Sequence, residues 1–153
     1  MTALELKIPP PVQALLTITG MWLTARYLPA FSFDLPWRTG LAISFASAGI
    51  LCILAGVLAF RKAMTTVNPL NPDATSTMVI SGIYRFSRNP MYVGLLLVLT
   101  AWAIYLSNAP AFLFLPVFVA CMTRLQIIPE ERALAAKFGD EFAAYKRSVR
   151  RWL

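Results

Sequence analysis

The sequence contains no histidine and few charged side chains. Histidine is the commonest metal ligand and the usual general base near neutral pH, so its absence argues against a histidine-bound metal and histidine-based catalysis. Only 14% of the 153 residues are charged, where a soluble domain has about a quarter. With 58% hydrophobic residues and a mean hydropathy of +0.64, the chain has a membrane-protein composition. A chain of this length is expected to form one domain.

Cysteines and acidic residues are also scarce. Cys52 and Cys121 fall within apolar stretches, where buried structural thiols are expected, and two cysteines suggest neither a disulfide framework nor a zinc site. Seven acidic residues stand against 14 basic ones, a formal net charge of +7. The basic residues flank apolar runs rather than line a polar face, so no nucleic-acid partner is expected. No small-residue cleavage site follows the first apolar run, so a signal peptide is not expected either.

What the chain does contain is four apolar runs. We expect membrane-spanning helices over residues 12–28, 39–60, 91–107 and 110–128. The second run has no charge, and its many small residues favour close helix packing and permit a homo-oligomer. Pro116 is expected to kink the fourth helix. The predicted fold class is therefore all-α: an integral, multi-pass membrane protein with four transmembrane helices plus a C-terminal amphipathic helical tail.

The tail, residues 129–153, intersperses apolar and basic side chains. The apolar residues recur every three or four positions, which is typical of helices lying on a membrane surface, and Gly139 predicts a break between two such helices. Most basic residues lie in the loop 61–89 and in the tail, and Arg26 and Arg38 are left for the other side. Because an excess of basic residues marks the cytoplasmic face, both termini, the loop and the tail are predicted to be cytoplasmic, in a bacterial inner (plasma) membrane.

Residues 81–94, SGIYRFSRNPMYVG, concentrate polar groups at one membrane edge. Asn89 is expected to cap the helix that Pro90 opens, because the missing N–H of proline is not needed in a first turn. The free N–H groups of that turn point back toward Arg85 and Arg88. Such a corner is suited to holding an anion at the rim of a bilayer.

Three further positions are part of the prediction. Asn108 is expected to cap the fourth helix as Asn89 caps the third. Residues 63–80 form the longest polar stretch, which is either the lid or rim of a site or a plain linker. Arg124 is the one basic residue well inside the fourth run. An arginine there is costly, so it either faces a cavity in a catalytic role or extends to the interface.

Two motif blocks carry the chemistry. The first contains Tyr84, Arg85, Arg88, Asn89, Pro90, Tyr92 and Gly94, and the second contains Glu130, Glu131, a later Phe-Gly pair and Tyr145. In this order, separated by one helical hairpin, they resemble the isoprenylcysteine carboxyl methyltransferase and phospholipid methyltransferase superfamily of integral membrane enzymes. In that superfamily an Arg-His-Pro-x-Tyr block opens a helix and a Glu-Glu block ends the next. Here Asn89 stands where histidine is usual, and an amide cannot titrate. The resemblance covers residues 65–153.

The resemblance implies methyl transfer from S-adenosylmethionine to a lipid-soluble or membrane-embedded acceptor. We expect the two blocks to bind this cofactor at the cytoplasmic ends of the last two spans. Its carboxylate suits an arginine at a helix start, its ammonium group and ribose suit the two glutamates, and its sulfonium is tolerated beside Tyr92 or Tyr145. An anionic acceptor needs no base, but a neutral amine does, and Glu131 is the candidate nearby.

Other interpretations stay open at this point. The two arginines are also explained as positive-inside anchors, the two glutamates as first-turn acids, and Tyr92 as an interfacial aromatic. An NADPH-dependent membrane reductase of the sterol reductase type has a similar Arg-x-Pro-x-Tyr block. A non-enzymatic binding or transport protein is a third interpretation, although no acidic residue lies in any span, which argues against a proton-coupled carrier. Acceptors include an isoprenylcysteine carboxylate, a phospholipid amine, a thiol or a phenol.

Overall fold

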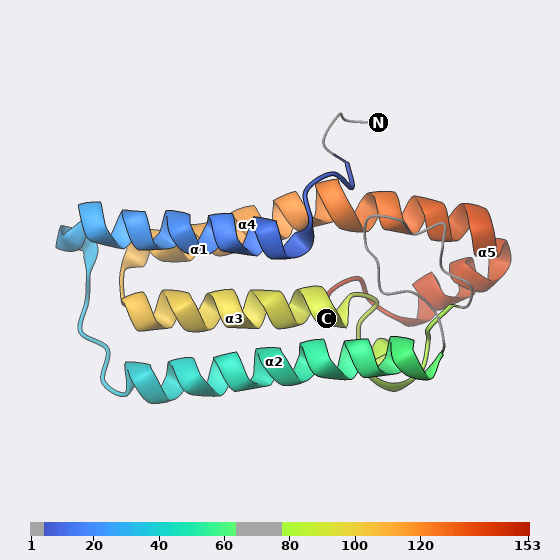
Figure 1. The fold of residues 1–153 in the computed structure, drawn as a ribbon, viewed down its shortest axis with the longest axis horizontal. Helices are drawn as coiled ribbons and strands as arrows, with labels where there is room; N and C mark the ends of the chain where they lie inside the picture. Colours follow the sequence, from blue (N-terminus) through green and yellow to red (C-terminus); the bar gives the residue numbers. More distant parts are fainter. Residues whose placement is uncertain (1–4, 64–77) are drawn as a thin grey trace.

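The computed structural model describes residues 5–63 and 78–153, and every regular element in these residues is a helix. The predicted all-α class is thus confirmed. Four long helical stretches lie alongside one another (Figure 1). They are α1 (Pro10–Tyr27), α2 (Arg38–Lys62), α3 (Pro90–Leu106) and a run through η4 (Ala109–Leu113), α4 (Phe114–Met122), η5 (Thr123–Ile127) and α5 (Ile128–Ser148). The short turns η1 (Pro29–Phe31) and η3 (Gly82–Arg85) lie in the connections.

The apolar helices follow the predicted runs closely. Within the described residues, two helical stretches are long and apolar enough to cross a membrane: α2, with a mean hydropathy of 2.4, and residues 109–148, with 1.9. Helix α3 is apolar but shorter. Helix α2 leaves large side chains such as Leu51 and Leu54 more than half exposed, which suits a helix that faces lipid rather than water. Most of residues 63–80, the predicted lid or linker, lies outside the described residues.

Helices α2 and α3 cross at a pair of glycines. A Cβ atom built on Gly49 would lie 2.6 Å from the carbonyl oxygen of Gly94, and the reverse distance is also 2.6 Å. The close approach of the two helices extends to Gly56 of α2, where an added Cβ atom would lie 2.6 Å from Cγ of Met91 in α3. Gly49 and Gly56, two of the small residues predicted to favour close packing, therefore face α3 within the chain. Gly94, which the sequence assigns to the cofactor site, is a helix-packing residue in the structure.

At the end of the bundle opposite the motif blocks, Asn108 joins two connections. Its Nδ2 donates hydrogen bonds to the carbonyl oxygen of Leu28, at 2.9 Å, and to Oγ of Ser32, at 3.2 Å. The backbone N–H of Phe33 donates to the carbonyl of Ser107 at 2.9 Å. Asn108 occupies the predicted N-cap position, but its side chain makes no capping hydrogen bond. The predicted position is confirmed and the predicted capping bond is wrong, because the amide is used for tertiary contacts.

The fourth run departs from α geometry at the 3₁₀ turn η4 and at the π-helical turn η5, and the predicted kink residue, Pro116, lies between them in the first turn of α4. Pro129 has no N–H to donate to the carbonyl of Leu125, its α-helical partner four residues earlier. That carbonyl instead accepts a hydrogen bond from the N–H of Leu6 at 3.0 Å. The π-helical turn η5 ahead of Pro129 is therefore stabilised by a hydrogen bond from Leu6, in the segment that precedes α1.

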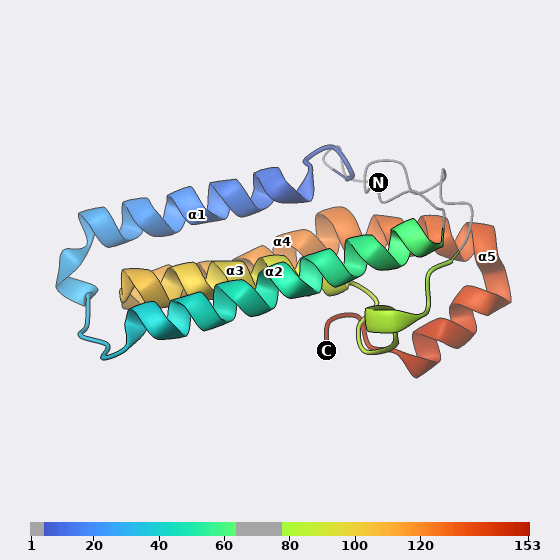
Figure 2. The same ribbon diagram turned by 60° about the horizontal axis from the view of Figure 1, so that its bottom comes forward.

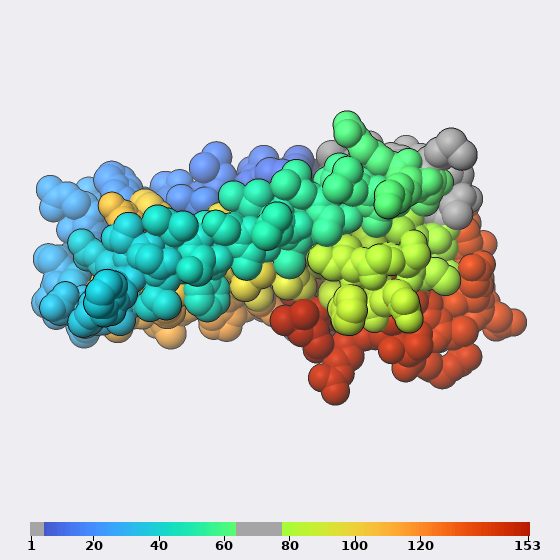
Figure 3. Space-filling model, turned by 90° about the horizontal axis from the view of Figure 1, so that it is seen from below, coloured from blue at the N-terminus to red at the C-terminus, as the bar shows by residue number. Residues whose placement is uncertain are grey.

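The predicted break in the tail is confirmed at Gly139, and the chain reverses its direction there. This residue has φ +50° and ψ −120°, a backbone conformation that favours glycine. The rest of α5 then turns back toward the start of α3 (Figure 2), and Figure 3 shows η3 packed between the end of α2 and the tail. Two aromatic residues of the tail face the protein: Phe142 is only 2% exposed, and the hydroxyl of Tyr145 bonds to the backbone of Tyr84.

The glycine crossing generates a stability prediction. Gly94→Ala places a methyl group 2.6 Å from the carbonyl oxygen of Gly49 and from Cγ1 of Ile53, and such overpacking costs about 1–3 kcal/mol. Thermal unfolding in detergent, followed by helical circular dichroism, should show a lower midpoint than for the parent protein. Gly40→Ala is the matched control, because no atom lies within 4 Å of its added Cβ. Equal midpoints for the two variants would contradict the close crossing.

Candidate functional site

The start of α3 and the returning tail enclose a polar cavity. It has a volume of about 80 Å³ and lies at the end of the bundle where η3 and α5 meet (Figure 3). Residues of both motif blocks line it together with apolar side chains: Met78, Val79, Tyr84, Arg88, Asn89, Glu130, Glu131, Leu134, Phe142 and Tyr145. The structure therefore brings together residues that lie more than forty positions apart in the sequence, as in Arg88 and Glu131.

Glu131 is held by two arginines. Nη2 of Arg88 donates to Oε1 of Glu131 at 2.7 Å, while Nε and Nη2 of Arg151 bond its two carboxylate oxygens at 3.0 and 2.7 Å. The side chains of Arg88 and Glu131 are 9% and 11% exposed, so this bond is largely shielded from water. Burial raises the pKa of Glu131, but the hydrogen bonds and charges of Arg151 and Arg88 outweigh it and leave the pKa below its ordinary value. This carboxylate is therefore ionised and engaged in structure.

Arg88 also binds the end of α5. Its Nη1 donates to the carbonyl oxygens of Val149, at 2.6 Å, and Lys146, at 3.1 Å, and its backbone N–H donates to the carbonyl of Arg150 at 3.0 Å. The last carbonyls of a helix lack intrahelical partners and carry partial negative charge, so a buried arginine is favourable there. The sequence places Arg88 at a helix start, facing an anion. In the structure, Arg88 instead donates three hydrogen bonds to carbonyl oxygens at and just beyond the C-terminal end of α5.

Asn89 takes part in the same contact. It occupies the N-cap position ahead of Pro90, as predicted, but makes no side-chain capping bond. Its Nδ2 donates to the carbonyl oxygen of Arg151 at 2.9 Å, and its backbone N–H donates to Oγ of Ser87 at 3.1 Å. Ser87 in turn donates to the same carbonyl of Arg151 at 3.5 Å. The amide at the position where the resembled superfamily has histidine thus holds the C-terminal segment.

Glu130 has different surroundings from its neighbour, because successive residues of a helix point about 100° apart. Its Oε1 accepts hydrogen bonds from the hydroxyl of Tyr92 at 2.6 Å and from Nε2 of Gln126 at 2.7 Å. No ion pair with Glu130 is found in the described part of the chain. Burial raises the pKa of Glu130 to about 7, and the two hydrogen bonds limit the rise. Glu130 is therefore a better proton acceptor near neutral pH than Glu131, the residue that the sequence suggested.

Aromatic side chains form the remaining walls of the cavity. The hydroxyl of Tyr145 donates to the backbone carbonyl of Tyr84 at 2.7 Å, and the ring of Tyr84 meets that of Phe60 edge-on at 5.4 Å. Burial raises the pKa of Tyr145 to about 12, and burial also raises the pKa of Tyr84. Both phenols are neutral at physiological pH. They offer ring faces and hydroxyl dipoles, not charge.

Several predicted site residues do not line this cavity. Arg85 and Arg124 are both exposed, and neither lines this cavity. Pro90 and Gly94 are buried in helix packing, and Tyr92 reaches the site through its bond to Glu130. The sequence analysis missed Arg151, Gln126 and Phe142. The basic C-terminal sequence contains Arg151, but the sequence does not identify Glu131 as its partner. The two residues meet because the chain reverses at Gly139.

The fold and the site together define a helical protein of membrane-protein character, with an arginine–glutamate cluster at one end of an apolar bundle. The chain belongs to the phospholipid methyltransferase family, whose model matches residues 37–141. It is also similar to an uncharacterized protein of Haemophilus influenzae, with 48% identity over 63 residues, which are 41% of this chain and 100% of that protein. No solved structure matches the chain. Membership confirms the resemblance drawn from the two motif blocks.

The adjacent glutamates are predicted to affect stability in opposite ways. Glu131→Gln breaks the bonds of two arginines and should lower stability near neutral pH by on the order of 2 kcal/mol. Because the folded-state pKa of Glu131 is lowered, its contribution is present at neutral pH and lost on acidification, so the deficit should shrink well below pH 4.5. The measurement is chemical or thermal unfolding in detergent across this pH range.

Glu130→Gln is the matched comparison. The folded-state pKa of Glu130 is raised from 4.5 to about 7, so the parent protein loses stability as pH rises through that interval. The amide does not ionise, so Glu130→Gln should equal the parent near pH 4.5 and exceed it above pH 7. A Glu131→Gln protein as stable as Glu130→Gln at pH 8 would contradict the different surroundings of the two side chains.

Proposed function

We propose that this protein transfers a methyl group from S-adenosylmethionine to a neutral, lipid-soluble acceptor, a phospholipid-type amine, at the cytoplasmic edge of a bilayer. The observation that carries the proposal is that both motif blocks face one cavity, beside a buried carboxylate with a pKa of about 7. Membership in the phospholipid methyltransferase family supports methyl transfer to a membrane lipid-type acceptor.

The topology is part of the proposal. We place α1, α2, α3 and residues 109–127 across the membrane as four spans of a single domain. Helix α3 has 17 residues, a length of about 26 Å, close to the ~30 Å of a bilayer core. The motif blocks and the basic tail lie at the same end of the bundle (Figure 1). That end is cytoplasmic by its excess of basic residues, in a bacterial inner membrane.

The cavity suits the charged end of the cofactor. Nε of Arg88 is buried and has no hydrogen-bond partner in the described residues, so one donor is free for an anionic group such as a carboxylate. Arg88 and Arg151 share one carboxylate, Glu131, which leaves one positive charge in excess. The rings of Tyr84 and Tyr145 can stabilise a sulfonium. A volume of about 80 Å³ holds only part of a nucleoside-sized molecule, so the remainder would lie beyond these walls.

The chemistry assigns a role to Glu130 in particular. When bound, S-adenosylmethionine supplies an electrophilic methyl group on a positively charged sulfur. A neutral primary or secondary amine that bonds to this methyl carbon would break the methyl–sulfur bond and release the sulfur as a neutral thioether. The resulting ammonium group would return to a neutral amine by giving a proton to a base. Glu130 accepts that proton, and Tyr92 orients its carboxylate through the 2.6 Å hydrogen bond. An anionic carboxylate acceptor would need no such base, so the environment of Glu130 favours the neutral acceptor.

The proposal predicts a pH-dependent rate. Purified protein incubated with labelled S-adenosylmethionine and a membrane lipid extract should yield a labelled lipid, and the rate should rise with pH and level off above about 7 as Glu130 ionises. Glu130→Gln should lower kcat by roughly 10²–10⁴-fold and remove this rise, while cofactor affinity stays close to that of the parent.

Glu141→Gln is the control for this experiment, because it removes an exposed carboxylate from the same helix. Its rate and pH profile should match those of the parent. If Glu130→Gln kept the parent's rate and pH profile, the assignment of Glu130 as proton acceptor would be wrong. If no lipid were labelled under any condition, the proposed methyl transfer itself would be wrong.

A further inference from the structure

A single stripe of side chains runs the length of α3 on the face between α1 and α2. Met91, Leu95, Val98, Trp102 and Tyr105 recur at spacings of four, three, four and three, so they lie on one face of the helix. Helices α1 and α2 both pack against α3. The distance along the helix from Met91 to Tyr105 is about 21 Å. Because the stripe begins beside Tyr92, it starts at the site and continues into the apolar bundle.

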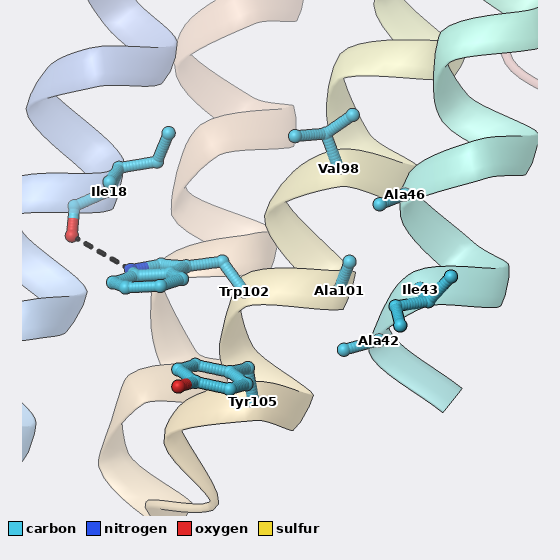
Figure 4. Close-up of a pocket in the computed structure, with 8 residues that line it drawn as sticks. All are labelled: Ile18, Ala42, Ile43, Ala46, Val98, Ala101, Trp102 and Tyr105. Atoms are coloured by element: carbon cyan, nitrogen blue, oxygen red, sulfur yellow. Dashed lines mark hydrogen bonds between the residues drawn. The ribbon is translucent and has the colours of Figure 1, made fainter. Parts of the chain in front are cut away.

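Two apolar cavities lie on this stripe. The inner one, of about 250 Å³, is lined by Met91, Tyr92 and Leu95 of α3 together with Ile53 and Val57 of α2. The outer one, of about 370 Å³, lies between Val98 and Trp102 of α3 and Ile43 and Ala46 of α2 (Figure 4). Leu95 and Val98, which line one cavity each, are one turn apart. The two cavities therefore follow one another along the same face of α3, and we call this face with its two cavities the α3 groove.

The wall of the α3 groove toward α1 is fixed by Trp102. Its indole Nε1 donates a hydrogen bond to the carbonyl oxygen of Ile18 in α1 at 3.2 Å, as Figure 4 shows. Its ring also stacks on that of Tyr105 at a centroid distance of 5.7 Å. A tryptophan held from both sides cannot turn freely to fill the space. The groove is thus built into the fold.

The lining of the α3 groove indicates what fits. Both cavities are lined by apolar and aromatic side chains, and among the described residues on these walls the only polar side-chain groups belong to Tyr92, Trp102 and Tyr105. An extended hydrocarbon chain suits such walls, because they offer it dispersion contacts and few polar groups.

The inner end of the α3 groove connects to the site. Tyr92 lines the inner cavity and donates its hydroxyl hydrogen bond to Glu130, which lines the polar cavity. Building on the proposed function, we infer that the α3 groove holds the hydrocarbon chain of the acceptor lipid, with the headgroup at Tyr92 and the chain running to Trp102 and Tyr105. A leaflet is about 15 Å deep, half of the ~30 Å bilayer core. A chain that fills ~21 Å therefore crosses the midplane, and the site selects long chains.

The test is photo-crosslinking of the full chain in phosphatidylcholine nanodiscs. The probe is a long-chain lysophosphatidylethanolamine that carries a diazirine at the end of its chain, and labelled residues are identified by mass spectrometry. Labelling is expected at Ile43, Trp102 and Tyr105, in the outer cavity. An excess of the same lipid without the diazirine should reduce this labelling roughly fivefold or more, whereas a lipid with a chain of about 8 carbons should not.

A pair of variants sharpens the test. Ala46→Phe fills the outer cavity and should reduce outer labelling roughly fivefold. Leu51→Phe is the control on the outward face of α2, where Leu51 is 65% exposed, and it should label as the parent does. If Ala46→Phe does not fold, as judged by gel filtration, Ile43→Phe serves in its place because Ile43 lines the same cavity from a more exposed position.

Two results would overturn the inference. Labelling that is spread over Leu51, Leu54 and other outward residues and is not reduced by the competitor means that the probe reports only surrounding lipid. Crosslinks between two copies through the stripe of α3 mean that a second chain covers it. Crosslinking requires no methyl transfer, so a groove that labels in a protein without activity would leave this inference standing while the proposed function fails.

Discussion

The bond of Glu131 to Arg88 and Arg151 is the contact on which the site depends. It joins three segments that are remote in sequence: the start of α3, the first part of α5 and the C-terminus. The other polar contacts of the tail beyond Gly139 to this corner are the bond from Tyr145 to the carbonyl of Tyr84 and the bonds from Arg88, Asn89 and Ser87 to backbone carbonyls of the tail, so Glu131 supplies its charged anchor. The cavity exists because the tail returns. An ion pair is usually a weak stability argument, but here the bond from Arg88 is largely buried and the bond from Arg151 is bidentate, which makes the contact specific.

The position of that bond also determines what its neighbour can do. In a helix, Glu130 and Glu131 cannot face the same partners, so once Glu131 binds the arginines, Glu130 is turned toward Tyr92 and Gln126. The pKa of Glu130 is thus raised and that of Glu131 is lowered, although the two residues are chemically identical neighbours. The separation of a structural carboxylate from a titrating one follows from helix geometry and from which side the tail approaches.

The parts of this structure that local pattern governs could be predicted from the sequence. The apolar runs predicted the helices, the Asn89-Pro90 pair predicted the start of α3, Gly139 predicted the break in the tail, and the two motif blocks predicted one shared site. What could not be predicted depends on the tertiary approach of distant segments. The amides of Asn89 and Asn108 bond to other connections, Gly94 is required by the backbone of α2, and Arg124 lies on an exposed surface. A sequence pattern shows that a polar side chain is present, but its partner is decided by packing.

The absence of histidine fits this arrangement. A histidine in place of Asn89 could also donate to the carbonyl of Arg151, but it would titrate near neutral pH and its charge would act on the neighbouring arginines. The amide donates at every pH. Among the described residues that line the polar cavity, the tyrosine pKa values are raised and that of Glu131 is lowered, so Glu130 is the group whose charge changes near pH 7. The tail is therefore held by contacts that do not respond to physiological pH, while proton transfer is confined to one carboxylate, and the two roles do not interfere.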